Sequence, residues 1–136
     1  MKEVEHLTTN LIPTVELQKA VYQKLSAHYT TYDLRPPNAQ FPYILIGEDV
    51  TVDNLTKGDK RTTHNLTIHT FSQSTKSLES KTMNHLVKES LLNDLELSGF
   101  YVDLNKLSMM MTTKEEETDG AIHHGIIQFD ITIREK

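Results

Sequence analysis

The sequence contains no cysteine and no tryptophan, and it has only 5 glycines and 4 prolines. The missing cysteine excludes disulfides, thiol nucleophiles and thiolate metal sites. Basic residues are also scarce, because 14 Lys and Arg stand against 19 Asp and Glu, which gives a formal net charge of -5. No overall basic field is present to attract phosphates, and we therefore expect no sequence-specific contact with nucleic acid.

Long apolar runs are missing as well, since none approaches the ~18 residues that a membrane span needs. The N-terminal residues "MKEVEHLTTN" lack the apolar core of a signal peptide. We expect a soluble protein that is not secreted and makes no membrane contact. The 136 residues, 37% of them hydrophobic, are enough for one core. We predict a single domain at residues 14–136, and residues 1–13 are either a mobile arm or a short extra helix.

Two segments have the apolar spacing of helices. The first is "TVELQKAVYQKLSAHY", for which Thr14 is the predicted N-cap. The second lies within "SQSTKSLESKTMNHLVKESLLNDLEL", with Ser74 or Ser77 as N-cap. Its predicted buried stripe consists of Met83, Leu86, Val87, Ser90 and Leu91.

The remaining segments favour strands. "YILIGED" predicts a strand that is buried on both faces at Tyr43–Ile46 and ends at Gly47–Asp49, behind the stiff segment 35–42 with its three prolines. "RTTHNLTIHTFS" alternates and predicts the partner strand of a hairpin. "FYVDLNKLSMMMTTKEEETDG" predicts one or two strands, with its three methionines in the core and at an edge, followed by an acidic turn. In the last strand, "AIHHGIIQFDITIRE", the inward side chains are Ile127, Phe129, Ile131 and Ile133.

The predicted order is therefore α-β-β-α-β-β. We expect an α+β fold in which two helices cover one face of a mostly antiparallel sheet. Little apolar surface should then remain exposed, which predicts weak self-association of the isolated chain.

Two charged excursions are the candidate interaction surfaces. The first is a predicted hairpin tip at Asp49–Lys60, held at a fixed angle by the proline segment, and the second is Thr112–Gly120. If the last two strands pair as a hairpin, we expect the two excursions to be neighbours. The candidate interface residues are Asp49, Asp53, Lys57, Asp59, Lys60, Glu115, Glu116 and Glu117.

Catalytic signatures are absent, since no P-loop, GxGxxG, GxSxG or HExxH motif occurs. Glu115–Glu117 lie in a polar turn, where solvated carboxylates do not acquire the raised pKa of a general acid. Among the seven histidines, neighbours along a strand point to opposite faces, and only a cross-strand pair such as His69 with His124 could share a metal ion. We expect no catalytic, cofactor or metal-binding residues and no enzyme activity; a small metal-dependent enzyme using that pair is the less favoured alternative.

The chain contains, in this order, helix one, "FPYILIGED", a polar excursion, "HNLTIHTFSQ", a helix and a strand beginning "HHGIIQFDITI". This order resembles that of the tail completion proteins of long-tailed bacteriophages. This family is also called tail terminator or tail-to-head joining proteins. The resemblance covers Val15 to Arg134. Phe71 stands where the family often has a tryptophan, which we interpret as a conservative change in the core. The lead at residues 1–13 is longer than in many members.

The resemblance implies a structural protein of the virion, at the head-proximal end of the tail, assembled in the cytoplasm of a bacterial host. Family members form a hexameric ring on the finished tail tube, stop its polymerisation and join it to the head connector. The implied partners are the major tail tube protein, the head-tail connector protein and further copies of the chain, with DNA passing through the ring. Another head-tail connector or a minor virion protein is the alternative that shares the same fold pattern.

Overall fold

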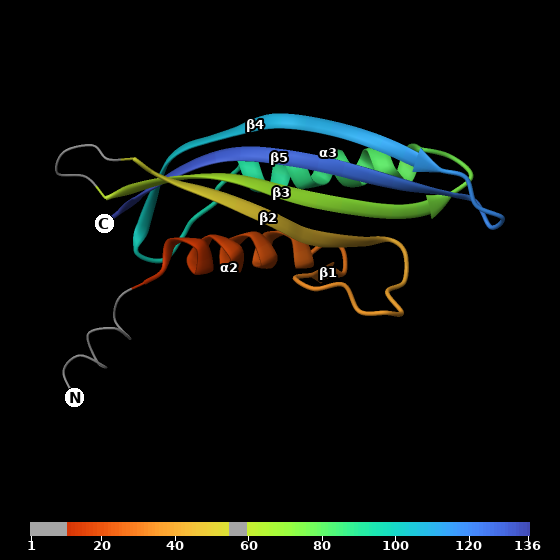
Figure 1. Ribbon diagram of the computed structural model, residues 1–136, viewed down its shortest axis with the longest axis horizontal. Coiled ribbons are helices and arrows are strands. Elements are labelled where there is room, and N and C mark those ends of the chain that lie inside the picture. Colours follow the sequence, from red (N-terminus) through yellow and green to blue (C-terminus); the bar gives the residue numbers. More distant parts are fainter. Residues whose placement is uncertain (1–10, 55–59) are drawn as a thin grey trace.

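Five strands form one sheet, and two helices cover one of its faces in the computed structural model, which describes residues 11–54 and 60–136 (Figure 1). The strand order is β1-β2-β3-β5-β4, and every pairing is antiparallel except the short parallel pairing of β1 with β2. The predicted α+β class is confirmed. The elements are α2 (Pro13–Ser26), β1 (Thr31–Tyr32), β2 (Tyr43–Asn54), β3 (Arg61–Ser74), α3 (Leu78–Leu92), β4 (Phe100–Glu115) and β5 (Ala121–Glu135).

The core lies between the helices and the inner face of the sheet. As predicted, the alternation of β5 turns four apolar side chains inward, each at most 1% exposed: Ile127, Phe129, Ile131 and Ile133. The helices supply the opposing layer, with each buried aliphatic side chain worth ~1.5–3 kcal/mol relative to an exposed one. The central buried residues are Leu17, Val21 and Leu25 of α2, Met83, Val87 and Leu91 of α3, and Ile127, Phe129, Ile131 and Ile133 of β5.

The first helix begins earlier than predicted. Ile12 occupies the N-cap of α2, and Pro13 is its first helical residue, so the prediction of Thr14 as N-cap is wrong. Proline suits this position because its missing N–H would have no intrahelical partner there. In α3, Ser77 is the N-cap, one of the two residues that the sequence predicted, although its hydroxyl makes no capping hydrogen bond.

The second strand is longer than predicted. β2 continues to Asn54, so Asp49 and Asp53 lie within a paired strand and the predicted tip at Asp49–Lys60 is wrong in its boundaries. The pairing with β3 is interrupted between Ile46 and Asp49, where a bulge takes up Gly47 and Glu48. The proline segment precedes one end of β2 and the connection to β3 follows the other, roughly 35 Å away by strand rise. The proposed bracing of the tip by the prolines is therefore wrong.

The three methionines were predicted in the core and at an edge; they lie at an edge, and the core part of the prediction is wrong. β4 is an edge strand, on which Met109 is half-buried while Met110 and Met111 are 37% and 44% exposed. Phe71 also lies elsewhere than predicted: it is a half-buried residue of the outer face, where its ring stacks on Tyr43. Both errors concern which face or edge a strand residue occupies, which depends on the pairing partners.

A buried polar contact fixes α3 on the sheet. The hydroxyl of Thr70 donates to Asn84 Oδ1 over 2.6 Å, and Asn84 Nδ2 donates to the hydroxyl of Thr112 over 2.9 Å. The backbone of Gly125 runs directly beneath this amide, and a Cβ there would overlap Asn84 Oδ1 and Thr70 Oγ1. The glycine therefore lets the helix approach three strands at once.

Candidate functional site

The two charged excursions lie at opposite ends of the sheet. In the antiparallel register of β3 with β5, Arg61 pairs with Arg134 and Ser74 pairs with Ala121. The β2–β3 connection is therefore at one end and the β4–β5 turn at the other, roughly 40 Å apart by strand rise. Figure 1 shows both ends. The last two strands do form the predicted hairpin, but the expectation that the excursions are neighbours is wrong.

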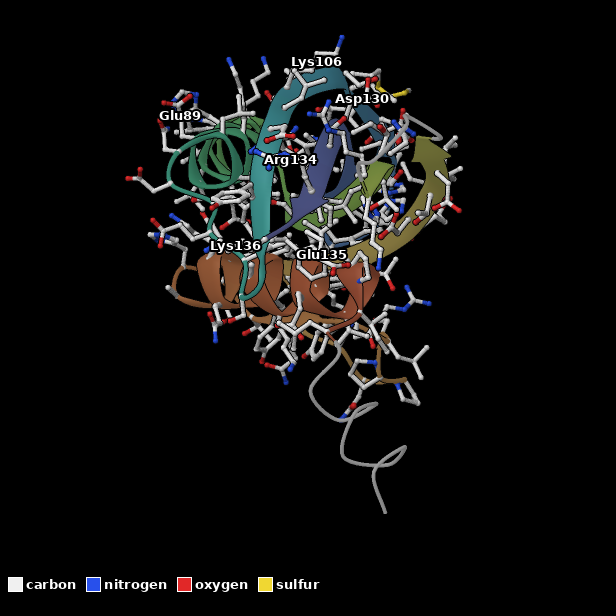
Figure 2. All side chains as sticks on the ribbon, turned by 90° about the vertical axis from the view of Figure 1, so that its left-hand side faces the viewer. Glu89, Lys106, Asp130, Arg134, Glu135 and Lys136 are labelled. Atoms are coloured by element: carbon white, nitrogen blue, oxygen red, sulfur yellow. The ribbon has the colours of Figure 1, made fainter. Side chains whose placement is uncertain are left out.

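At the β2–β3 end, two arginines share one carboxylate. Arg134 donates to Asp103 through two nitrogens, at 2.9 and 3.3 Å, and Arg61 Nε lies 3.4 Å from the same side chain. The hydrogen bonds from Arg134 lower the pKa of Asp103, and the charges of both arginines add to this effect. The Arg134 guanidinium also lies 4.6 Å from the ring centre of Tyr101. Figure 2 looks onto this end and shows Arg134 beside the C-terminal residues.

Two candidate interface residues belong to the same end of the sheet. Lys60 is exposed, and its Nζ lies 4.0 Å from Glu135 Oε1. Asp53 is exposed on β2, opposite Thr62 in the register. Lys57 and Asp59 lie outside the described residues. An exposed pair such as Lys60 with Glu135 contributes little to stability, so both side chains are available to a partner.

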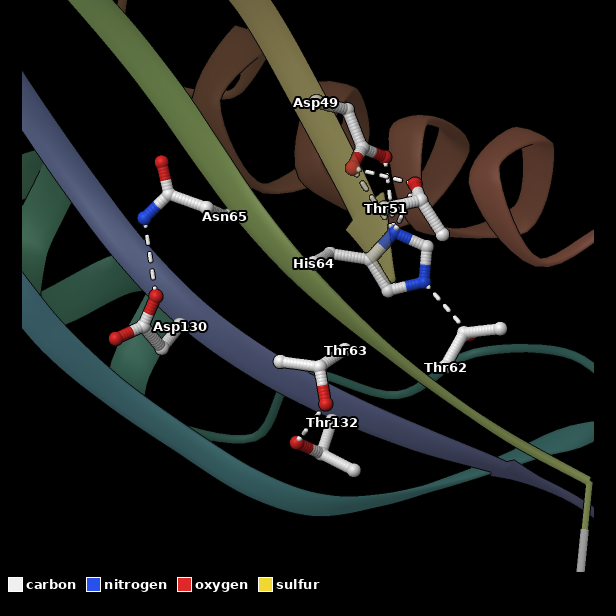
Figure 3. Close-up of polar contacts among 8 residues, drawn as sticks. All are labelled: Asp49, Thr51, Thr62, Thr63, His64, Asn65, Asp130 and Thr132. Carbon is white, nitrogen blue, oxygen red and sulfur yellow. Dashed lines mark hydrogen bonds and ion pairs between the residues drawn. The ribbon is translucent and has the colours of Figure 1, made fainter. Parts of the chain in front are cut away.

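Asp49 has a structural contact instead of an exposed position at a tip. It faces His64, which is fully buried beneath the helices, and both carboxylate oxygens lie 3.0 Å from His64 Nδ1 (Figure 3). Thr51 approaches the same nitrogen at 3.1 Å, and Thr62 lies 2.8 Å from Nε2. Because both ring nitrogens have partners, the buried imidazole is satisfied, and the contact joins β2 to β3.

Asp49 also borders a cleft of about 360 Å³ between α2 and β2. Among the described residues that line the cleft, Asp49 is the only acidic one, and the others are largely apolar or neutral. The lining residues are Thr14, Val15, Leu17, Gln18, Lys19, Tyr22, Ile46, Gly47, Asp49 and Leu66.

At the opposite end, the three consecutive glutamates are exposed. Glu115 ends β4, and Glu116 and Glu117 continue into the turn. Lys114 Nζ lies 3.4 Å from Glu116 Oε1, and both side chains are more than half exposed. The turn therefore presents a predominantly negative surface to solvent, as the sequence predicted.

The outer face of the sheet carries ordered polar pairs that sequence reasoning missed. Asn65 Nδ2 donates to Asp130 Oδ1 over 3.0 Å, and the hydroxyls of Thr63 and Thr132 lie 3.0 Å apart (Figure 3). These pairs join β3 to β5 and became visible only with the strand register, because their partners lie more than sixty positions apart in sequence.

Both edges of the sheet expose apolar side chains. β1 pairs with β2 only at Ile44 and Leu45, so in the described part of the chain no strand covers the rest of that edge. The expectation that little apolar surface remains exposed is therefore wrong. The exposed side chains are Val50 and Val52 on β2, at 59% and 57%, and Leu104, Met110 and Met111 on β4, at 45%, 37% and 44%.

The histidines lie on the faces that the sequence predicted. His64 and His123 are buried on the inner face, while His69 and His124 meet on the outer face. Within residues 11–54 and 60–136, no three His, Asp or Glu side chains are grouped to hold a metal ion. No helix in this part of the chain is long and apolar enough to cross a membrane.

Comparison with known proteins agrees with the fold. One similar structure, from a virion of a native gene transfer agent particle, is 21% identical and has a TM-score of 0.75, covering 89% of this chain and 96% of that one. The gp17 protein of bacteriophage SPP1 is 23% identical and has a TM-score of 0.61, covering 91% and 93%. No curated protein sequence matches. The profile of the family described as tail completion protein gp17 matches residues 5–134, nearly the whole chain. The chain therefore belongs to the bacteriophage tail completion proteins and is a structural component of the virion.

Proposed function

We propose that this chain forms a ring on the head-proximal end of the tail tube, with the six copies that the family resemblance implies. The ring ends polymerisation of the major tail tube protein and joins the tube to the head connector protein after assembly in the host cytoplasm. Its role is structural and not enzymatic. Family membership supports the role in the tail, and the two unlike open edges of the sheet support the ring.

The open edges carry this proposal because a closed ring needs two different contact patches on each subunit. The open part of β2 and the strand β4 lie at opposite edges of the sheet, and each edge has its own exposed apolar side chains. The β2 edge of one subunit, with Val50 and Val52, would contact the β4 edge of the next, with Met110 and Met111. Burial of these side chains favours association, at ~25 cal/mol per Å² of apolar area.

The two ends of the sheet remain for the partners above and below the ring. The turn with Glu115–Glu117 is negative, whereas the opposite end combines Lys60 and Arg134 with carboxylates. Six copies of the turn would place eighteen carboxylates on one rim. Such a field attracts a basic partner surface and keeps passing DNA from adhering.

The test mixes the purified chain with major tail tube protein and follows tube growth by light scattering and electron microscopy. We expect growth to stop at a small molar ratio of the chain. Val52→Lys and Met111→Lys, one at each edge, should each abolish the arrest. Leu78→Lys is the matched control, because Leu78 is 74% exposed on α3 and lies on neither edge. Tubes that keep growing with the wild-type chain would contradict termination and favour another connector role.

A further inference from the structure

Two histidines face each other on the outer face of the sheet. His69 of β3 and His124 of β5 have ring centres 5.0 Å apart, and Nδ1 of His69 lies 2.8 Å from Nε2 of His124. At this distance a single proton is shared between two nitrogens, so one of them presents a lone pair to the other. Both side chains are half-buried and border on solvent.

Three neighbours hold these rings in place. Glu48 Oε1 lies 3.3 Å from Nε2 of His69 and accepts a hydrogen bond from its N–H. In this tautomer Nδ1 of His69 is the unprotonated nitrogen. Gly47 makes room for the same ring, because a Cβ there would lie 2.8 Å from its Nε2 and Cδ2. Phe71 stacks on His124 with ring centres 4.4 Å apart and 15° between planes. The bulge in β2 thus places a glycine and a carboxylate at the two positions that orient His69.

We propose that His69 Nδ1 and His124 Nε2 together bind one divalent transition metal ion, such as Zn²⁺. Imidazole nitrogens ligate zinc at ~2.0–2.1 Å, so two of them around a tetrahedral ion lie roughly 3.3 Å apart. The present 2.8 Å separation needs only a small opening of the pair. His124 carries its proton on Nδ1 in the bound form, and water completes the coordination. Glu48 acts as the carboxylate that accepts a hydrogen bond from the ligating histidine; such a carboxylate fixes the histidine tautomer and raises its basicity.

Because only two protein side chains ligate the ion, the affinity of the site is moderate. This proposal concerns one subunit and does not depend on ring formation.

The test titrates Zn²⁺ into the full chain at pH 7.5 by calorimetry in a buffer that does not chelate zinc. We expect one equivalent to bind, and His69→Gln or His124→Gln to remove that binding. Glu48→Gln should weaken it by about 10-fold or more, since outer-shell partners commonly contribute 10–100-fold. His85→Gln is the matched control, because it removes an exposed histidine from α3 and should leave binding unchanged.

A second measurement uses only the wild-type protein, so it does not depend on the folding of any variant. Zinc should shift the imidazole NMR resonances of His69 and His124 and leave those of the exposed His28 and His85 in place. The proposal is overturned if zinc binds equally well to the His124→Gln protein, if the exposed histidines shift first, or if no binding occurs at millimolar zinc.

Discussion

Replacing Gly125 by alanine should destabilise the protein more than any surface change. The added Cβ would overlap the oxygens of Asn84 and Thr70, which are 3% and 1% exposed. Asn84 must then move, and its hydrogen bonds with Thr70 and Thr112 are lost. Overpacking costs ~1–3 kcal/mol and an unsatisfied buried amide ~1–3 kcal/mol, which gives about 2–6 kcal/mol in total. For a domain of this size the melting temperature should fall by roughly 8–20 °C.

Thermal unfolding followed by circular dichroism measures this effect, and a double-mutant cycle gives its cause. Asn84→Ala removes the oxygen that the new methyl group meets, so Gly125→Ala should cost less in that background, with a coupling of at least ~1 kcal/mol. A Gly125→Ala protein that melts within about 1 °C of the wild type would show that the added methyl group meets no such overlap. Penalties that simply add would show that the methyl group does not act through Asn84.

Three further predictions follow from charge and exposure. Changing Glu115, Glu116 and Glu117 together to Lys should leave the melting temperature nearly unchanged, because exposed substitutions usually change the free energy of unfolding by no more than ~0.5 kcal/mol. Head joining should nevertheless fail in a salt-dependent way, and normal infectivity of a phage with this change would contradict the prediction. Burial lowers the pKa of His124 in the folded protein, so below pH ~6.5 the unfolded chain binds more protons than the folded one. The stability that the neutral ring contributes is therefore complete above pH ~6.5 and is lost as the pH falls below that value. His124→Gln should remove that part of the pH slope in denaturant titrations, and an unchanged slope would disprove the assignment. Asp49→Asn should lower the free energy of unfolding by about 1–3 kcal/mol, because the fully buried His64 loses its carboxylate partner. Urea unfolding measures this change, with Asp53→Asn as the exposed control, and equal urea midpoints for the two variants would contradict the prediction.

The sequence predicted what depends on local pattern. The strict alternation of β5 identified its inward residues, and the same period placed His123 and His124 on opposite faces. The hairpin of β4 with β5 and the position of α3 also followed from turn and helix patterns.

What the sequence could not give depends on the pairing of distant strands. The bulge at Gly47 and Glu48 shifts the alternation of β2, so its polar continuation resembled a loop and Asp49 resembled a tip residue. The contact of Asp49 with His64 follows only from that shifted register. The three methionines were predicted to lie in the core and at an edge, and only the edge position is correct, because it is set by strand order, which no local period encodes.

The same limit applies to the candidate interaction surfaces. Glu115–Glu117 were predicted as an exposed acidic turn, and they are exposed. Their distance from the β2–β3 connection is set by the antiparallel register of β3 with β5, in which Arg61 meets Arg134. The pairing of His69 with His124 was one of several open combinations, and the register selected it.

Electron microscopy of tails assembled with and without the chain measures directly whether it ends the growth of the tail tube. We expect tails of uniform length, with an additional ring at the head-proximal end, when the chain is present, and tubes of uncontrolled length without it. Tails of the same uniform length in both preparations would contradict termination by this chain.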